Sequence, residues 1–374
     1  MIDLLTFSFR ELNIMSAIKY FLMTSLLFTS QAFAQQEIQF VGSHAQPLPS
    51  STYDTLTRLQ SQNLPTSVTL LNVQLTENAW NKLRARTQDM ESKQLNRNAA
   101  PAFTTKNMQL GMGNVPVLDQ GAHGTCVTFA NTAAIDAALN QGDNISQLCQ
   151  LQLGRYLEKN GYGVSGWNGS MSPSVLHQMQ TFGVVNKTMQ RNIGCGGLTD
   201  YPTSNALEPE SEISLNDYHA ISEILPKNQV AWTSLLDAYQ VFLDRTDSNK
   251  TLLVTKAALD AGDRLTFGVL LFAIDQGVAG AVGKYKASND SWVLTPEIIK
   301  IIKDGKSQPG GHAMIITGYN DDAIAIDKQG RSHQGLLTLR NSWGDRIGDQ
   351  GNFYMSYDYF RNLTIEVTRI RSTR

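Results

Sequence analysis

The stretch QGAHGTC, residues 120–126, leads directly into an alanine-rich segment that runs to Asn140. Glycine permits tight turns that other residues resist, and small side chains recur along one face of the segment at helical spacing. The sequence therefore predicts a glycine-rich turn and then a closely packed helix, with Cys126 in its first turn. There the helix dipole and unpaired N–H groups favour a thiolate, which is a ready nucleophile.

Two later segments carry side chains that can act with such a thiol. His312 stands at the start of the apolar stretch AMIIT, and Asn341 and Trp343 follow the stretch LLTLR. A histidine can serve as general base, an asparagine can fix its tautomer, and a tryptophan can shield that hydrogen bond from water. Taken singly, each residue also has a purely structural interpretation: Cys126 as a buried cysteine, His312 as a core histidine and Asn341 as a turn asparagine. In combination they indicate a catalytic site.

In this combination the sequence resembles the papain-like cysteine peptidases. The matching blocks stand in the family's order: PVLDQG (116–121), GTC (124–126), IS (145–146), NG (168–169), GHA (311–313), GY (318–319) and NSWG (341–344), followed by Gly348 and Gly351. The resemblance extends patchily over residues 102–360. It implies an α+β fold of two lobes: a helical lobe with the cysteine, and an antiparallel, barrel-like sheet lobe with the histidine and the asparagine.

The resemblance gives four residues a catalytic role. It implies that Cys126 attacks the peptide carbonyl as a thiolate, and that His312 forms an ion pair with it and protonates the leaving amine. Asn341 would orient His312. The side-chain amide of Gln120 and the backbone N–H of Cys126 would form the oxyanion hole, where losing one donor typically costs roughly 2.7–4 kcal/mol. No cofactor and no metal are expected.

A second set of residues is expected to bind substrate. Asn168, Gly169 and Ser170 stand where the family has Asn-Gly-Gly, which binds an extended substrate backbone. Ser170 keeps the backbone N–H and C=O for that contact, but its side chain narrows the cleft. Met171 and Ser172 are candidate walls of the main specificity pocket, and Trp343 is expected beside the cleft.

The sequence departs from the family around the nucleophile. His123 and Trp167 stand where the family has the two halves of a disulfide, so both halves are replaced together. An alternative interpretation makes His123 a rival base. From Cys126 to His312 there are 186 positions, against roughly 130–150 in the family. We place the excess in an insertion within residues 203–300, which is expected to shape access to the cleft.

The chain has three cysteines, an odd number for an exported protein. The resemblance assigns Cys126 as the free nucleophile. That leaves Cys149 and Cys195 as the intramolecular disulfide.

The N-terminus is typical of an export signal. From Met15, where we expect translation to start, a positive charge precedes an apolar run at 21–28 and the small-x-small ending QAFA at 31–34. Residues 1–34 are therefore interpreted as a signal peptide, which implies a secreted or periplasmic protein without a membrane anchor; the alternative is a membrane-anchored N-terminus. The apolar run is too short to span a bilayer.

Residues 35–100 precede the peptidase-like region, which is expected to occupy 101–374. A strand is predicted at 66–75 and a helix from Thr76 to about residue 95, whereas 35–65 shows no periodicity. This small α/β module is positioned like a self-inhibitory propeptide; the alternative is an accessory domain that binds a partner.

Composition sets limits on the class of protein. With 374 residues, 41% of them hydrophobic, and a net charge of −2, the chain can fill a core and gives no electrostatic case for nucleic acid. Pattern predicts helices at 145–158, 173–181 and 230–243. It predicts strands at 265–272, 313–319, 323–327, 336–340 and 352–357.

The leading hypothesis is a secreted cysteine endopeptidase, made as a zymogen, that acts on proteins or peptides. An exopeptidase on the same scaffold and a non-catalytic peptide-binding protein are alternatives. A transglutaminase-like enzyme would need an aspartate as third member, for which Asp321, Asp322 and Asp327 lie near in sequence.

Overall fold

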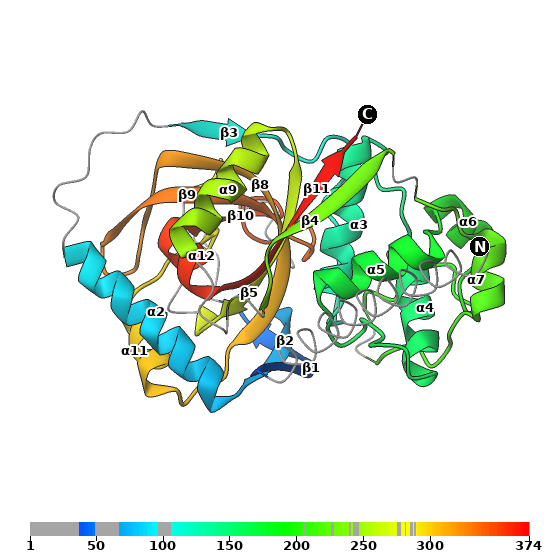
Figure 1. Ribbon diagram of the computed structural model, residues 1–374, viewed down its shortest axis with the longest axis horizontal. Coiled ribbons are helices and arrows are strands. Elements are labelled where there is room, and N and C mark those ends of the chain that lie inside the picture. Colours follow the sequence, from blue (N-terminus) through cyan, green and yellow to red (C-terminus); the bar gives the residue numbers. More distant parts are fainter. Residues whose placement is uncertain are drawn as a thin grey trace, which may run out of the picture.

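The computed structural model describes residues 37–48, 67–95, 106–204, 207–225, 228–238, 241, 247–274, 278–280, 282–284, 287 and 289–373. The expected signal peptide lies outside these residues. A helical lobe and a sheet lobe stand side by side (Figure 1), as the resemblance implied. In the described part of the chain, no helix has both the length and the apolarity to cross a membrane.

The helical lobe is built around α3 (Cys126–Leu139), whose residues are almost all buried. The helix ends where Asn140 takes a left-handed conformation at φ 55°. Around it lie α4 (Gln147–Lys159), α5 (Ser172–Phe182), α6 (Lys187–Ile193) and α7 (Leu215–Ile221). The alanine face lets α3 approach its neighbours closely, and the helices predicted at 126–140, 145–158 and 173–181 are confirmed within two residues.

The sheet lobe holds one large sheet. Its strands run in the order β4 (Val230–Leu236), β11 (Thr364–Ser372), β5 (Arg264–Leu271), β8 (Gly310–Ile326), β9 (Ser332–Arg340), β10 (Asn352–Ser356), β7 (Ser291–Trp292) and β6 (Val278–Ala279). The short β3 (Asn107–Gln109) pairs with β8. Helices α9 (Ser248–Asp260), α11 (Pro296–Asp304) and α12 (Tyr357–Leu363) complete the lobe.

The expectation of an antiparallel, barrel-like sheet needs two corrections. First, one strand pair is parallel: β10 pairs antiparallel with β9 on one side and parallel with β7 on the other. Within the described residues no ladder joins β4 to β6, so the sheet is mixed and open. The pieces that depart from the expected pattern come from residues 230–292, inside the predicted insertion.

Two element predictions were wrong. The helix predicted at 230–243 is instead strand β4 over its first seven residues, because Val230–Leu236 pairs antiparallel with β11. The strands predicted separately at 313–319 and 323–327 are one strand, β8, with a bulge where the register with β9 shifts between Asn320 and Ile324. The Asn320 side chain accepts hydrogen bonds from the N–H groups of Asp322 and Ala323, which stabilises the bulge.

The N-terminal module packs on the sheet lobe. β1 (Ile38–Pro47) pairs antiparallel with β2 (Ser67–Leu75), and α2 (Glu77–Leu95) follows after Thr76 accepts the N–H of Ala79. β1 lies in a region where the sequence showed no periodicity. β2 and α2 were predicted. The described residues of the module share one apolar core with the sheet lobe; Trp80, for example, lies 5.7 Å from Phe272 between ring centroids.

Candidate active site

Cys126 begins α3 and is the free cysteine of the three. Its side chain is 1% exposed. Burial raises the pKa of the thiol to about 12, although the backbone N–H groups of Ala313, Val127 and Cys126 itself act in the opposite direction. The hydrogen bond with Ala313 places the sulfur beside the residue that follows His312 in β8.

His312 and Asn341 form the second part of the site. Nε2 of His312 lies 2.8 Å from Oδ1 of Asn341. Because that oxygen also accepts the backbone N–H of Ser342 at 2.7 Å, the amide oxygen is fixed toward the ring and Nε2 carries the proton. Nδ1 has no partner among the described residues, so it is the basic nitrogen. The ring stacks on Trp343 with centroids 4.2 Å apart.

Burial lowers the pKa of His312 to about 4, against the raising effect of Asn341. The aspartates considered for a transglutaminase-like site point elsewhere. Asp321 is bound by Lys256 and Tyr357, and Asp327 by Arg331. The partner of the histidine is therefore the asparagine.

Gln120 is buried and links the two lobes. Its Oε1 accepts the hydroxyl of Ser342 at 2.7 Å, and its backbone N–H donates to the carbonyl of Ser342 at 2.8 Å. Its Nε2 donates to the carbonyl of His123 at 2.9 Å. A primary amide has two N–H donors, so one remains for an oxyanion. Ser342 is a positioning residue that the sequence reasoning missed, although it lies within the NSWG block.

Two of the residues expected to bind substrate, Asn168 and Trp343, lie next to the candidate catalytic residues. Asn168 bridges to Gly124, and Gly169 takes φ +112°, a conformation that favours glycine. Met171 is half-buried against the core of the sheet lobe. Ser170 is buried and also lines a separate cavity in the helical lobe. Trp343 packs on His312.

The N-terminal module contacts the candidate site through β2. Leu71 pairs with Gly311, next to the catalytic candidate His312. A Cβ on Gly124 would lie 2.7 Å from the Leu71 side chain, and one on Gly169 would lie 3.3 Å from it. The Thr69 hydroxyl donates to the carbonyl of Gly121 at 3.0 Å. Leu71 shares an apolar cluster with Cys126, and this strand contributes to the burial of the thiol and the imidazole.

The replaced disulfide has become an aromatic contact. The rings of His123 and Trp167 meet edge to face with centroids 4.9 Å apart, and Trp167 stacks on Tyr201. A nitrogen of His123 lies 2.8 Å from the carbonyl of Pro202. Burial lowers the pKa of His123, an effect that this carbonyl partly offsets. The His123 ring therefore packs in the interior of the lobe, which argues against the alternative that His123 is the general base.

Comparison with known proteins bears on the same residues. Residues 301–372 match the model of the Peptidase C1-like family, and that stretch contains both His312 and Asn341. This C-terminal part of the chain is therefore similar to the Peptidase C1-like family. A search of curated proteins finds no match to the chain.

Several solved structures are similar to this chain. Xylellain, a cysteine protease from Xylella fastidiosa, is 19% identical; the match covers 74% of this chain and 94% of that one, with a TM-score of 0.44. Procathepsin L 3 of Tenebrio molitor is 15% identical, with 74% and 72% covered and a TM-score of 0.42. The bromelain protease of Ananas comosus is 16% identical, with 72% and 99% covered and a TM-score of 0.40.

The disulfide of the peptidase joins Cys149 and Cys195, whose Cα atoms lie 5.2 Å apart. The pairing expected from the sequence is therefore present. The bridge spans 46 positions, and a loop of that length is stabilised by roughly 4 kcal/mol on the chain-entropy model. It ties α4 to the loop that follows α6, away from the nucleophile.

A buried carboxyl near the cleft was missed in the sequence. Glu366 of β11 is 3% exposed and accepts hydrogen bonds from the Ser172 N–H at 3.1 Å and hydroxyl at 2.9 Å. Burial raises its pKa to about 7, and its charge adds to the raised pKa of Cys126. Nothing in the stretch TIEVTRI marks this residue as functional. Among the described residues, no group of three or more His, Cys, Asp or Glu side chains could hold a metal ion.

Proposed function

We propose that this peptidase is an exported cysteine endopeptidase that is made as a zymogen. The observation that carries the proposal is the hydrogen bond between Nε2 of His312 and Asn341, which leaves Nδ1 without a partner among the described residues, while Ala313, the next residue of β8, contacts the Cys126 sulfur. This order of groups is what a thiol, its base and an orienting amide require.

The reaction follows from these groups. Cys126 gives its proton to Nδ1 of His312, and the thiolate attacks the carbonyl carbon of the peptide bond. The negative oxygen that forms is bound by the Gln120 amide and the Cys126 backbone N–H. His312 then protonates the leaving amine as the C–N bond breaks, which leaves a thioester. Water, deprotonated by His312, hydrolyses the thioester and restores the thiol.

The N-terminal module is proposed to hold this pair inactive. Burial raises the pKa of Cys126 to about 12 and lowers that of His312 to about 4. With the two values in this order the neutral thiol and neutral imidazole are favoured over the ion pair. Withdrawal of β2 with Leu71 would admit water, bring the two pKa values toward each other and open the cleft to substrate.

Endopeptidase action is favoured over exopeptidase action by the place of the insertion. The described elements of the insertion pack within the two lobes: α7 packs on α4, and β4 extends the sheet beyond β11. The first residue of the insertion supports the loop that holds Gln120, since the carbonyl of Thr203 accepts the N–H of Ala122. Tyr201, just before the insertion, also supports this loop, because its hydroxyl donates to the carbonyl of Gln120. The Cys149–Cys195 disulfide is consistent with export to an oxidising compartment.

The test is self-processing of the chain from residue 35 onward. β3 pairs with β8 and the N–H of Lys106 donates to Asp321, so we expect cleavage before residue 106 and a product that digests unfolded protein. The Cys126→Ser variant should stay intact. Absence of processing and of proteolysis by the wild-type chain, also after limited cleavage by an added protease, would contradict the proposal.

A further inference from the structure

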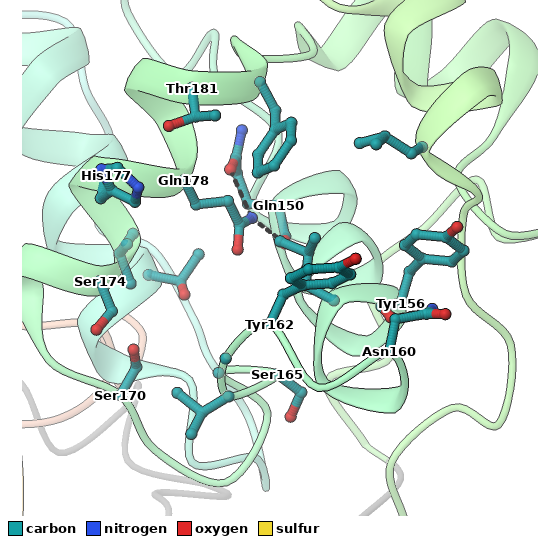
Figure 2. A pocket seen from close by; sticks show the side chains of 18 of the residues that line it. Gln150, Tyr156, Asn160, Tyr162, Ser165, Ser170, Ser174, His177, Gln178 and Thr181 are labelled. Carbon is teal, nitrogen blue, oxygen red and sulfur yellow. Dashed lines mark hydrogen bonds between the residues drawn. The ribbon is translucent and has the colours of Figure 1, made fainter.

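The helical lobe contains a cavity of about 810 Å³ between α5, α4 and the loop that follows α4 (Figure 2). It lies within the roughly 300–1,000 Å³ typical of small-molecule sites. Ser170, from the loop expected to bind substrate, forms part of its wall. No residue of the N-terminal module lines it among the described residues, so the cavity is open while the cleft is covered.

One wall of the cavity is a polar stripe on α5. Ser174, His177, Gln178 and Thr181 line it, and positions three, four and seven apart share one face of a helix. Their side chains stand on the same side in Figure 2. Within the described residues, the hydroxyls of Ser174 and Thr181 and the imidazole of His177 have no hydrogen bond to another side chain, so this stripe offers free donors and acceptors to a ligand.

A buried amide fixes the orientation of the stripe. Gln150 is 2% exposed, and its Nε2 donates to the Tyr218 hydroxyl at 2.6 Å and to the carbonyl of Gly183 at 3.2 Å. Its carbonyl groups accept Nε2 of Gln178 at 2.7 Å from the backbone and 3.0 Å from the side chain. The Gln178 amide is thereby oriented, and Oε1 of Gln178 remains as an acceptor facing the cavity.

The opposite wall carries aromatic rings. Tyr156 and Tyr162 line it, and Tyr162 is 78% exposed. An exposed tyrosine combines a flat apolar face with a hydroxyl. The described lining contains no Asp, Glu, Lys or Arg, although 17% of the chain is charged. His177 is the one side chain of the described lining that can carry a charge, so the cavity offers little that would select a charged ligand.

We propose that this cavity binds a neutral saccharide. Its hydroxyls would be met by the amide and hydroxyl groups of α5, and an apolar face of a sugar ring would pack on Tyr162. A second site of this kind next to Ser170 would direct the peptidase to glycosylated or glycan-associated polypeptides.

An extended peptide is the other ligand to consider, and the walls fit it less well. A peptide that binds in extended form relies on main-chain partners at a strand or loop edge. Here the polar wall is a helix, whose N–H and C=O groups are already bound within the helix. Side-chain amides and hydroxyls are what remain, and these match separated hydroxyl groups better than a regular backbone.

The experiment uses the exported chain with Cys126→Ser, which stays uncleaved, so that binding is measured independently of peptidase activity. Cellotriose, maltotriose and tri-N-acetylchitotriose are titrated by calorimetry, with trigalacturonate as a charged control and a Gly-Ser hexapeptide as a peptide control. We expect at least one neutral trisaccharide to bind at least tenfold more tightly than trigalacturonate or the peptide.

Two variants assign the binding to the cavity. Tyr162→Ala and Gln178→Ala should each weaken saccharide binding at least tenfold, whereas Gln180→Ala, which alters an exposed residue of α5 that does not line the cavity, should leave it unchanged. The proposal is overturned if none of the neutral trisaccharides binds at roughly 10 mM, well above a millimolar Kd. It is also overturned if Tyr162→Ala and Gln178→Ala do not weaken saccharide binding, or if they weaken binding of the peptide instead.

Discussion

Shortening Leu71 tests the proposal that the N-terminal module holds the candidate active site inactive. Its side chain is 2% exposed and lies against Gly124, Gly169 and Gly311. A buried Leu→Ala change typically costs about 2–5 kcal/mol, and here that loss falls on the closed state, because the side chain is rehydrated when β2 leaves the cleft. At 1.36 kcal/mol per tenfold, the open population should rise between about 30-fold and several thousandfold.

The assay is the rate at which iodoacetamide alkylates Cys126 at neutral pH, followed by mass. When opening and closing are fast, such a rate follows the open population, so Leu71→Ala should be alkylated at least about 30-fold faster than the parent chain. The chain should carry a mutation that blocks processing and leaves Cys126 in place, such as His312→Ala, so that the module stays attached during the measurement.

Two control variants separate opening of the cleft from general loss of stability. Val41→Ala changes a residue of β1 that is 48% exposed, and Leu153→Ala removes a fully buried side chain of the helical lobe. Neither should accelerate alkylation as Leu71→Ala does, although Leu153→Ala should lower the unfolding temperature. Equal alkylation rates for Leu71→Ala and Val41→Ala would refute the reasoning.

Three further predictions concern the site itself. Asn341→Ala removes the hydrogen-bond partner of His312, which lies at 2.8 Å. Because hydrogen bonds to charged groups contribute about 1.5–3 kcal/mol, kcat/KM of the processed enzyme should fall about 10- to 150-fold. An unchanged kcat/KM would contradict the role of Asn341 in orienting His312. Ser342→Ala removes the 2.7 Å bond to Gln120 and should lower kcat about 2- to 10-fold with little change in KM, whereas a change confined to KM would argue against a role in the oxyanion hole. Glu366 has its pKa raised from 4.5 to about 7 in the folded state, so its contribution to stability is present below about pH 4.5 and is lost as the pH rises to about 7. The unfolding temperature of Glu366→Gln should therefore depend less on pH across that window than that of the parent, and equal slopes would show that Glu366 does not titrate there.

Local sequence was sufficient to place a candidate site residue where a short-range structural pattern and a chemically reactive side chain occur together. Cys126 at the start of an alanine-rich helix and His312 at the start of an apolar strand each occupy the expected place, because a helix start and a buried strand leave strong local signals. The same holds for the α2 helix after Thr76. The two-lobed architecture followed from the resemblance and from the change of period along the chain.

Elsewhere the structure depends on contacts between residues far apart in the sequence, which local sequence patterns could not predict. The stretch VAWTSLL was interpreted as helical, yet it forms β4 because a partner strand about 130 positions later offers its edge. Leu71 could not be assigned to the cleft, since its contact with Gly311 joins residues 240 positions apart. Glu366 gave no signal for the same reason: its partner Ser172 comes from the other lobe.

The most direct test of the account is the mass of the protein after treatment with a thiol-reactive epoxide inhibitor, before and after removal of the N-terminal module. The account predicts one adduct on Cys126 in the processed enzyme, with complete loss of proteolysis, and an adduct formed far more slowly in the intact chain. An active processed enzyme that remains unmodified at Cys126, or an intact chain that is labelled as fast as the processed one, would contradict it.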